Sequence, residues 1–345
     1  MAGEDDGAVV IVTQTPLRIG LLGGGTDLPG YYREHGGRVL NAAIDKYIYV
    51  IVKERFDDDI YLNYSRKEVV SRVEDIEHDL VREALLMTGV TGGVEITTLA
   101  DVPSAGSGLG SSSSVTVGLL NALYAYQGHQ VPAADLAERA CAIEIERCGK
   151  PIGKQDQYIA ALGGIRDIRF GPGDDVTAEE LLLPPAVRRT LQQQIMLFYT
   201  GITRSADPIL AEQNANVAIT RSHLDVLRDL AGFAADRLRC GDLADIGPAV
   251  REGWEAKRKL ASGVSNELID LAVSRVLEAG ASGAKVTGAG GGGFLFALCA
   301  AEHQHAVREA VKDMRELPVK LDRFGSRIVL NAMREIWSLP GYRLR

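Results

Sequence analysis

Residues 103–114 combine glycine backbone with hydroxyl side chains, a pattern that suits phosphate binding. The segment reads Pro-Ser-Ala-Gly-Ser-Gly-Leu-Gly-Ser-Ser-Ser-Ser. Glycines let the backbone approach a ligand, and the unpaired amides at a helix start attract anions. Hydroxyls bind phosphate oxygens or a hard cation such as Mg²⁺. The alternative interpretations are a flexible serine linker and a serine-capped helix.

The sequence on either side favours the phosphate interpretation. Residues 94–99 are typical of a strand, and residues 115–126 carry apolar side chains at helical spacing. The loop fits neither a Walker motif nor a dinucleotide fingerprint. The nearest Walker match, residues 149–155, is one residue short and lacks the hydroxyl. The glycine spacing at 106, 108 and 110 is wrong for a dinucleotide site.

Length, composition and charge narrow the class of protein. The 345 residues are long enough for two domains, and 46% hydrophobic with 24% charged residues is typical of a globular protein. The net charge of −8 argues against nucleic acid as a partner. No apolar run approaches the ~20 residues of a membrane span. Residues 1–7 are acidic, unlike a signal peptide, so we expect a cytoplasmic protein without a membrane partner.

The expected strands and helices are intermixed, with few tight βαβ repeats, which predicts an α+β fold. We expect a domain change within residues 171–191, which are rich in Gly, Pro and acids, and hence two domains, 1–180 and 181–345. The expected strands are 8–12, 38–42, 47–54, 94–99, 164–170, 194–199 and 327–331, with a strand-loop-strand over 283–300. The expected helices are 115–126, 133–147, 208–239, 247–261, 266–279 and 302–317.

Two further segments carry polar residues that could do chemistry. In residues 15–29, glycines clear space while Thr26 and Asp27 offer hydrogen bonds to a polyol; a hairpin turn closed by Asp27 is the alternative. In residues 144–158, Asp156 lies in a glycine-flanked loop that suits a general base. Glu146, near a helix end, could complete a metal site with the loop serines, although a solvated helix face is the better explanation of both Glu144 and Glu146.

Residues 285–294 form a third glycine-rich segment. Five of the six residues 288–293 are glycine, between two apolar strands. So many glycines are costly in backbone entropy, which indicates close approach to a ligand or to another loop. A purely structural turn is the alternative.

Together these segments resemble the GHMP kinases, a family named for galactokinase, homoserine, mevalonate and phosphomevalonate kinases. Residues 15–27 are similar to the first motif of that family, 103–114 to its second and 285–294 to its third. Within the family, residues 23–29, 41–47, 153–158 and 199–205 are most similar to the heptose 7-phosphate kinases. Galactokinases carry a Glu-His pair where this chain has Gly24 and Gly25, which makes plain galactose a less suitable substrate.

The resemblance implies two α+β domains, the second ferredoxin-like, with the active site in the cleft between them. It implies that ATP, with Mg²⁺, phosphorylates the anomeric hydroxyl of D-glycero-D-manno-heptose 7-phosphate, for nucleotide-activated heptose and polysaccharide synthesis. Its partners are then ATP and a small phosphorylated sugar, with a homodimer left open. A fucose or hexose 1-kinase and a non-catalytic sugar-binding regulator are the alternatives.

The resemblance also assigns roles to residues. It implies Asp156 as the base and Arg18 as its catalytic partner. The residues implied to bind ATP are Pro103, Ser104, Ala105, Gly106, Ser107, Gly108, Leu109, Gly110, Ser111, Ser112 and Ser113. Those implied to bind the sugar are Gly24, Gly25, Thr26, Asp27, Gly153, Lys154, Gly290, Gly291 and Arg204. The implied Mg²⁺ ligands are Ser111, Ser112 and Glu146, and the candidates for the 7-phosphate are Arg204, Lys46 and Arg33.

Overall fold

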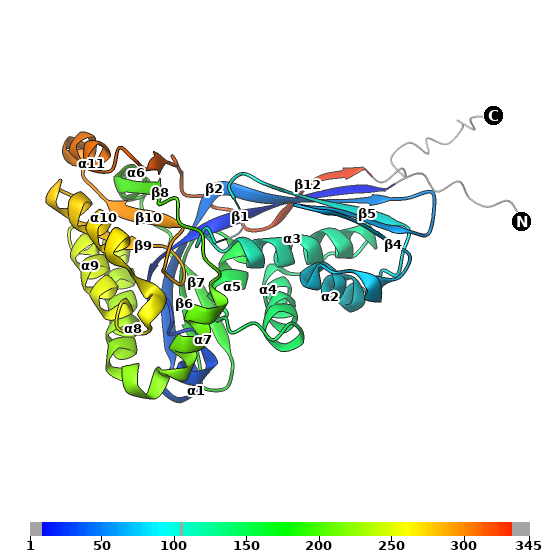
Figure 1. The fold of residues 1–345 in the computed structure, drawn as a ribbon, viewed down its shortest axis with the longest axis horizontal. Helices are drawn as coiled ribbons and strands as arrows, with labels where there is room; N and C mark the ends of the chain where they lie inside the picture. The colour runs from blue at the N-terminus through cyan, green and yellow to red at the C-terminus, as the bar shows by residue number, and fades with distance from the viewer. Residues whose placement is uncertain (1–8, 104–105, 333–345) are drawn as a thin grey trace, which may run out of the picture.

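The computed structural model describes residues 9–103 and 106–332. Within them the strands form two sheets, and the first, with eight strands, runs through the long part of the molecule (Figure 1). Its order is β12-β1-β2-β5-β3-β4, with β6 on a further stretch of β2 and β7 beside β6. The strands are β1 (Val10–Leu22), β2 (Gly37–Glu54), β3 (Ile60–Asn63), β4 (Lys67–Val70), β5 (Val94–Ala100), β6 (Ile165–Phe170), β7 (Val176–Glu180) and β12 (Arg327–Ala332).

The second sheet has four antiparallel strands in the order β11-β8-β10-β9 among the described residues. They are β8 (Ile195–Tyr199), β9 (Gly283–Val286), β10 (Phe294–Leu298) and β11 (Arg315–Glu316). Helices lie between the first and second and between the third and fourth of these strands. That strand order and connection are those of a ferredoxin-like domain, so the expectation for the second domain is confirmed.

One helix lies at the centre of the hydrophobic core of the first domain. Helix α3 (Ser111–Tyr126) packs against β1 and β2 on one side and against other helices on the other. Val117, Leu119, Leu120 and Leu123 are fully buried in this position. The other helices around this sheet are α1 (Pro29–His35), α2 (Asp79–Thr88), α4 (Ala133–Cys141), which continues as a π-helical turn over Ala142–Arg147, and α5 (Gln155–Leu162).

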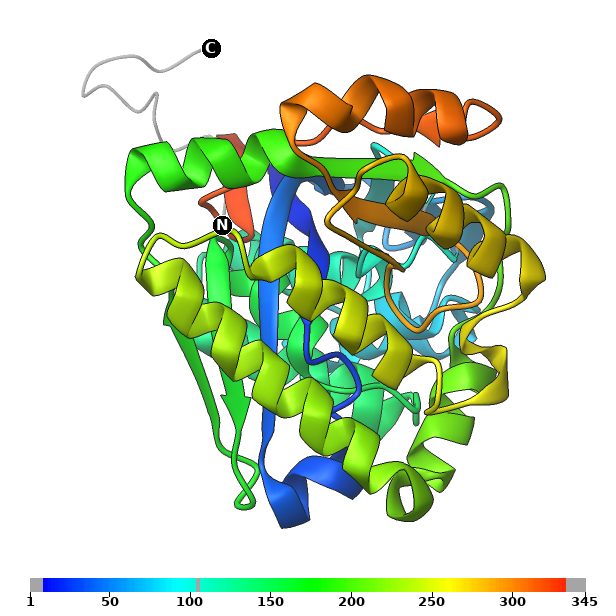
Figure 2. The same cartoon turned by 90° about the vertical axis from the view of Figure 1, so that its left-hand side faces the viewer.

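The helices of the second half close the first sheet on its other side. The long helix α8 and helix α9 pack together, and both contact β1 (Figure 2). The strand β1 thus buries Leu17 and Ile19 in the core while Arg18, Gly20 and Leu22 line a cavity next to α9. The helices here are α6 (Pro185–Gln194), α7 (Asp207–Ala215), α8 (Val217–Arg239), α9 (Ile246–Lys257), α10 (Glu267–Glu278) and α11 (Gln304–Ala310).

Several expected elements differ from those observed. Residues 38–42 and 47–54 belong to one strand, β2, because residues 42–44 also pair with β1. The expected helix over 302–317 ends early, since residues 315–316 pair with β8 instead. Helices α1, α2, α5 and α6 and strands β3, β4, β7 and β11 were not expected. The division at residue 180 stays a prediction, although β12 returns to the first sheet by pairing with β1.

Candidate active site

The glycine–serine loop has the backbone of an anion site. It connects β5 to α3, and Gly106, Gly108 and Gly110 have φ values of 66°, 70° and 78°. This left-handed conformation is nearly free for glycine and costly for other residues. Gly110 is the N-cap of α3, so the amides that open the helix have no earlier turn to bond to. The loop therefore offers backbone donors at a helix N-terminus, where negative charge is stabilised.

The third glycine segment, residues 285–294, packs directly against this loop. A Cβ at Gly108 would lie 2.6 Å from the Thr287 carbonyl oxygen, and one at Gly293 would lie 2.4 Å from the Ser107 carbonyl oxygen. The Thr287 hydroxyl also donates to Ser107, at 3.2 Å. Close approach to another loop, one of the two roles expected for this segment, is thus what the geometry shows.

The two glycines of that segment expected at the sugar are placed elsewhere. A Cβ at Gly290 would meet Val264, and one at Gly291 would meet Gly263 and Ile209. Neither glycine lines the cavity described next. Their lack of a side chain serves backbone packing here, and their role in sugar binding stays a prediction.

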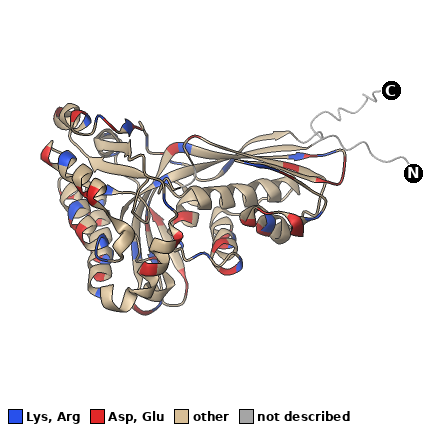
Figure 3. Cartoon of the chain, viewed as in Figure 1, with Lys and Arg blue, Asp and Glu red and all other residues tan. Residues whose placement is uncertain are grey.

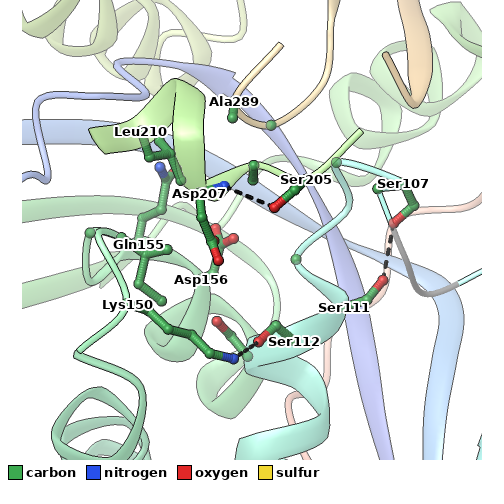
Figure 4. Close-up of a pocket in the computed structure, with 18 of the residues that line it drawn as sticks. Ser107, Ser111, Ser112, Lys150, Gln155, Asp156, Ser205, Asp207, Leu210 and Ala289 are labelled. Carbon is green, nitrogen blue, oxygen red and sulfur yellow. Dashed lines mark hydrogen bonds between the residues drawn. The ribbon is translucent and has the colours of Figure 1, made fainter. Parts of the chain in front are cut away.

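A cavity of about 510 Å³ lies between the phosphate loop and the helices of the second half. Residues 106–108 and 110–113 line one side, and Asp27, Gly153, Asp156 and Lys257 line another. Figure 4 shows Asp156 and Gln155 within this pocket, facing the segment with Ser205 and Asp207. Both domains contribute to the lining, which agrees with the expected cleft between them.

Arg18 and Asp156 form an ion pair at the boundary between the phosphate loop and the part of the cavity that Asp27 and Gly153 line. The Arg18 guanidinium donates from Nε to Asp156 Oδ1 at 2.7 Å and from Nη2 to Oδ2 at 2.6 Å. Its Nη1 donates to the Gly108 carbonyl at 2.6 Å. Asp156 lies in the first turn of α5, rather than in the expected loop. This paired geometry fixes the carboxylate next to the phosphate loop.

A second network, of hydrogen bonds, holds Asp27 near Asp156. The Gly25 amide and Gln155 Nε2 each donate to Asp27 Oδ1 at 3.0 Å, and the Asn41 amide donates to Gln155 Oε1 at 3.1 Å. Burial, and then the charge of Asp156, raise the pKa of Asp27. A Cβ at Gly153 would lie 1.9 Å from Asp27 Oδ2, so only glycine fits there.

The acidic residue that the loop serines bond is Glu144, not Glu146. The fully buried Glu144 carboxylate accepts hydrogen bonds from Ser112, from Ser113 at 2.7 Å and from Gln157 at 2.7 Å. Burial raises the pKa of Glu144, against the effect of these hydrogen bonds. Glu146 is exposed on the same π-helical turn and does not line the cavity. The altered spacing of a π-helix determines which residue turns inward, and no pattern in the sequence marks this turn.

The serines that were implied as metal ligands have different surroundings. Ser112 bonds Glu144 and also accepts from Lys150 Nζ at 3.3 Å, whereas Ser111 bonds Ser107 at 3.0 Å (Figure 4). A hydroxyl and a carboxylate are ligands that Mg²⁺ accepts, and it needs only one or two of them from a protein. Ser112 and Glu144 therefore fit a magnesium ion better than Ser111 with Glu146.

The remaining predicted residues divide between cavity and scaffold. Gly24, Gly25 and Arg204 line cavities. Thr26 is buried and bonds the Gly23 and Arg38 carbonyls, and Lys154 bonds Asp174, so neither faces the cavity. Leu109 is in the core, and its carbonyl accepts from the Arg18 amide. Pro103 does not line the cavity, and Ser104 and Ala105 lie outside the described residues.

Among the cavity residues that were not predicted are Gln155, Lys257 and Lys285. Gln155 is next to Asp156 in the sequence, and that adjacency could have drawn attention to it. Lys257 is the last residue of α9, and Lys285 is the first residue of the third glycine segment, of which only Gly290 and Gly291 were predicted at the site. A lone lysine near a helix end has no distinctive signal, because most such lysines are solvated.

The comparisons with known proteins agree with this fold and site. The family profile described as GHMP kinases N terminal domain matches residues 62–164, and that described as GHMP kinases C terminal matches residues 211–317. A D-glycero-alpha-D-manno-heptose 7-phosphate kinase of Campylobacter jejuni is 30% identical, over 83% of this chain and 88% of that protein. The chain therefore belongs to the GHMP kinase family.

Other relatives give the range within the family. The L-fucokinase/L-fucose-1-P guanylyltransferase of Bacteroides fragilis is 29% identical over 87% of this chain, which spans 35% of that protein. The crystal structure of a D-glycero-D-manno-heptose 1-phosphate kinase from Bacteroides thetaiotaomicron superposes with a TM-score of 0.77 at 26% identity, covering 92% of this chain and 98% of that one.

The surface charge is mixed. Lysines and arginines alternate with acidic residues along the helices of both halves (Figure 3). Across residues 9–103 and 106–332, no helix combines the length and the apolar character that crossing a membrane requires.

Proposed function

We propose that this protein is an ATP-dependent kinase that phosphorylates the anomeric hydroxyl of D-glycero-D-manno-heptose 7-phosphate to give the 1,7-bisphosphate. The observation that carries the proposal is the Arg18–Asp156 pair, which lies between the phosphate loop and the Asp27 network. Two hydrogen bonds of 2.6–2.7 Å join the two side chains. The similarity to a heptose 7-phosphate kinase supports the choice of sugar. The product would enter the synthesis of nucleotide-activated heptose.

The phosphate loop would bind the ATP phosphates through its backbone. The amides at Gly106–Ser111 replace the lysine that a Walker loop uses, and the dipole of α3 adds to their effect. Phosphoryl transfer depends mostly on positioning and on neutralising charge. A loop whose φ values only glycine adopts easily is fixed before the nucleotide binds.

Asp156 would orient the sugar O1 hydroxyl and accept its proton as the bond from O1 to the γ-phosphorus of ATP forms. The bond from that phosphorus to the β,γ-bridging oxygen would break in the same transfer, with ADP as the leaving group. Arg18 holds this carboxylate in place through two parallel hydrogen bonds. The same guanidinium, anchored on the Gly108 carbonyl at 2.6 Å, lies beside the loop and offsets charge on the transferring group. Asp27, held by Gly25 and Gln155, would accept hydrogen bonds from the sugar hydroxyls.

Ser112 and Glu144 would hold the Mg²⁺ that accompanies ATP. When bound, the ion neutralises charge on the phosphates. Lys150, 3.3 Å from the Ser112 hydroxyl, adds a further positive charge at this edge of the cavity. Gln157 and Ser113 hold the Glu144 carboxylate in place.

A panel of acceptors tests the proposal. ADP release would be measured with the heptose, heptose 7-phosphate, L-fucose, D-mannose and D-galactose, each with ATP and Mg²⁺. We expect heptose 7-phosphate to give the highest kcat/KM, and NMR of the product to show phosphate at C1. Faster turnover of fucose, which the fucokinase relative makes the second candidate, would overturn the choice of sugar. Binding of sugar without ADP release would indicate a regulator.

A further inference from the structure

A second, smaller cavity lies behind Arg18, between β1 and the second domain. It has a volume of about 40 Å³, room for a few water molecules. Arg18, Gln155, Lys257 and Gly288 line both this inner cavity and the large one, so the two are neighbours. Trp254 and Lys285 line only the inner cavity.

The Lys257 ammonium group lies beside Gly24 and Gly25, at the inner cavity. Its Nζ donates to the Gly24 carbonyl at 2.9 Å and to Gln213 Oε1 at 3.3 Å. A Cβ would lie 3.8 Å from this Nζ at Gly24 and 3.4 Å from it at Gly25. Larger side chains there would compete with the ammonium group for space. The Gly-Gly pair of the first motif therefore lies in direct contact with a positively charged group.

Lys285 has no acidic partner within the described part of the chain. No hydrogen bond or ion pair of its ammonium group is found among residues 9–103 and 106–332. Burial, and then the charges of Lys257 and Arg18, lower the pKa of Lys285 to about 7. The carboxylates that could neutralise the charge of Lys285 already interact with other cations. Asp156 pairs with Arg18, and Asp27 faces Lys257. Three cations thus face two carboxylates.

We propose that Lys257 and Lys285 bind the second phosphate group of a phosphorylated acceptor sugar at the mouth of the inner cavity. The inference rests on the proposed function and names the residues that would select the phosphorylated substrate. With O1 at Asp156, the far end of the sugar would extend past Gly24 and Gly25 toward Lys257. A phosphate dianion there compensates the surplus positive charge.

The three cations suggested by the sequence are less suitable. Arg33 pairs with Asp174 at 3.0 Å, and Lys46 pairs with Asp45 at 2.9 Å. Neither lines a cavity at the site. Arg204 lines the large cavity from an exposed position, where a phosphate contact is screened by water.

A pair of substrates isolates the contribution of the lysines. The variants Lys257→Met and Lys285→Met would be assayed with heptose 7-phosphate and with the unphosphorylated heptose. We expect Lys285→Met to lower kcat/KM for the phosphorylated sugar by about 30-fold or more, because it removes one partner of a buried charge pair. With the unphosphorylated heptose the change should stay within about threefold. Lys259→Met, an exposed lysine on the neighbouring turn, is the matched control and should change neither value.

Two outcomes of that assay would overturn the inference. An equal loss with both sugars would mean that the lysines act on the ATP phosphates, and no loss would mean that they bind nothing. Lys285→Met should fold stably, because the substitution removes an ammonium group that has no partner among residues 9–103 and 106–332 and keeps an apolar side chain of similar length. Thermal unfolding of each variant checks this.

Binding of inorganic phosphate gives a readout that does not depend on turnover. Phosphate would be titrated calorimetrically into the protein saturated with Mg²⁺ and a non-hydrolysable ATP analogue, which occupies the phosphate loop. We expect one site, weakened at least about tenfold in Lys285→Met and unchanged in Lys259→Met. Lysine-dependent binding without heptose phosphorylation would refute the proposed function alone. Heptose 7-phosphate turnover without lysine dependence would refute the phosphate site alone.

Discussion

The two sides of the cavity are built in different ways. The nucleotide side consists of one continuous loop whose backbone does the binding, with glycines at 106, 108 and 110 in the left-handed conformation. The acceptor side consists of side chains from β1, β2, α5, α9 and β9, which are far apart in the sequence. A backbone site is rigid before its ligand arrives, whereas a side-chain site determines which ligand is accepted. This division lets the phosphate loop serve many kinases while the acceptor side sets the substrate.

The two sides also differ in charge. The loop itself carries no charged residue from 106 to 114, so its positive character comes from amides and a helix dipole. The acceptor side holds Arg18, Lys257 and Lys285 around two carboxylates. Substitutions on the acceptor side should therefore change chemistry and substrate choice, and those on the nucleotide side should change ATP and Mg²⁺ requirements.

The largest effect is expected at the boundary between the two sides, for Asp156→Asn. This change keeps the shape but removes the proton acceptor and the charge that Arg18 pairs with. Because general-base assistance is worth about 10²–10⁴-fold, kcat should fall by at least that range. Steady-state ADP release measures it.

The control for this variant is binding of an ATP analogue by calorimetry, which should be unchanged because Asp156 does not hold the loop glycines. Turnover within tenfold of the wild type would refute the role of Asp156 as base, and a parallel loss of nucleotide affinity would place the residue on the nucleotide side.

How far the site could be predicted from the sequence follows the same division. The phosphate loop and Asp156 were predicted because each stands in a contiguous pattern, and Arg18 and Asp27 because the family motif carries them. Lys257 and Lys285 were missed because only the folding of α9 and β9 against β1 brings them together. Glu144 was exchanged with Glu146 because both lie on one short segment and a π-helical turn determines which is buried.

The fold shows the same limit. The ferredoxin-like order of the second sheet was expected from the family resemblance and is present. Helix α6 has few apolar residues, and only Leu191 of them is buried, so the sequence offers few apolar positions from which to detect it. The return of β12 to β1 is a contact over more than three hundred residues, which local patterns cannot predict.

The next largest effect tests the metal part of the nucleotide side. Glu144→Gln removes the buried carboxylate beside Ser112 and Ser113 but keeps its size. We expect the Mg²⁺ concentration for half-maximal activity to rise by about 10–100-fold. Glu146→Gln is the matched control, an exposed residue two positions away. If Glu146→Gln had the larger effect, the assignment of the ion to Glu144 would be wrong.

A smaller effect is expected from the loop backbone. Gly108→Ala forces a side chain into φ 70° and places its Cβ 2.6 Å from the Thr287 carbonyl. A left-handed residue costs about 1–2 kcal/mol, so KM for ATP should rise by about 5–30-fold. Gly128→Ala is the control, because Gly128 has φ 78° and nothing lies within 4 Å of the added atom. That variant should lose stability alone. A normal KM for ATP in Gly108→Ala would show that the loop is not preformed.

The smallest effect is a pH dependence confined to the acceptor side. Burial lowers the pKa of Lys257 to about 8 and that of Lys285 to about 7, and the facing groups are Arg18, Asp27 and Asp156. A lysine is charged below its pKa, so raising the pH from 7 to 9 removes positive charge from the inner cavity. KM for heptose 7-phosphate should then rise by about three- to tenfold, while KM for the unphosphorylated heptose and for ATP stays level. A bound phosphate favours the charged lysine, so the rise should begin above pH 7. If KM for the phosphorylated sugar fell as the pH rose, the two lysines would not supply the positive charge of the acceptor side. Deprotonation can only make that side less positive.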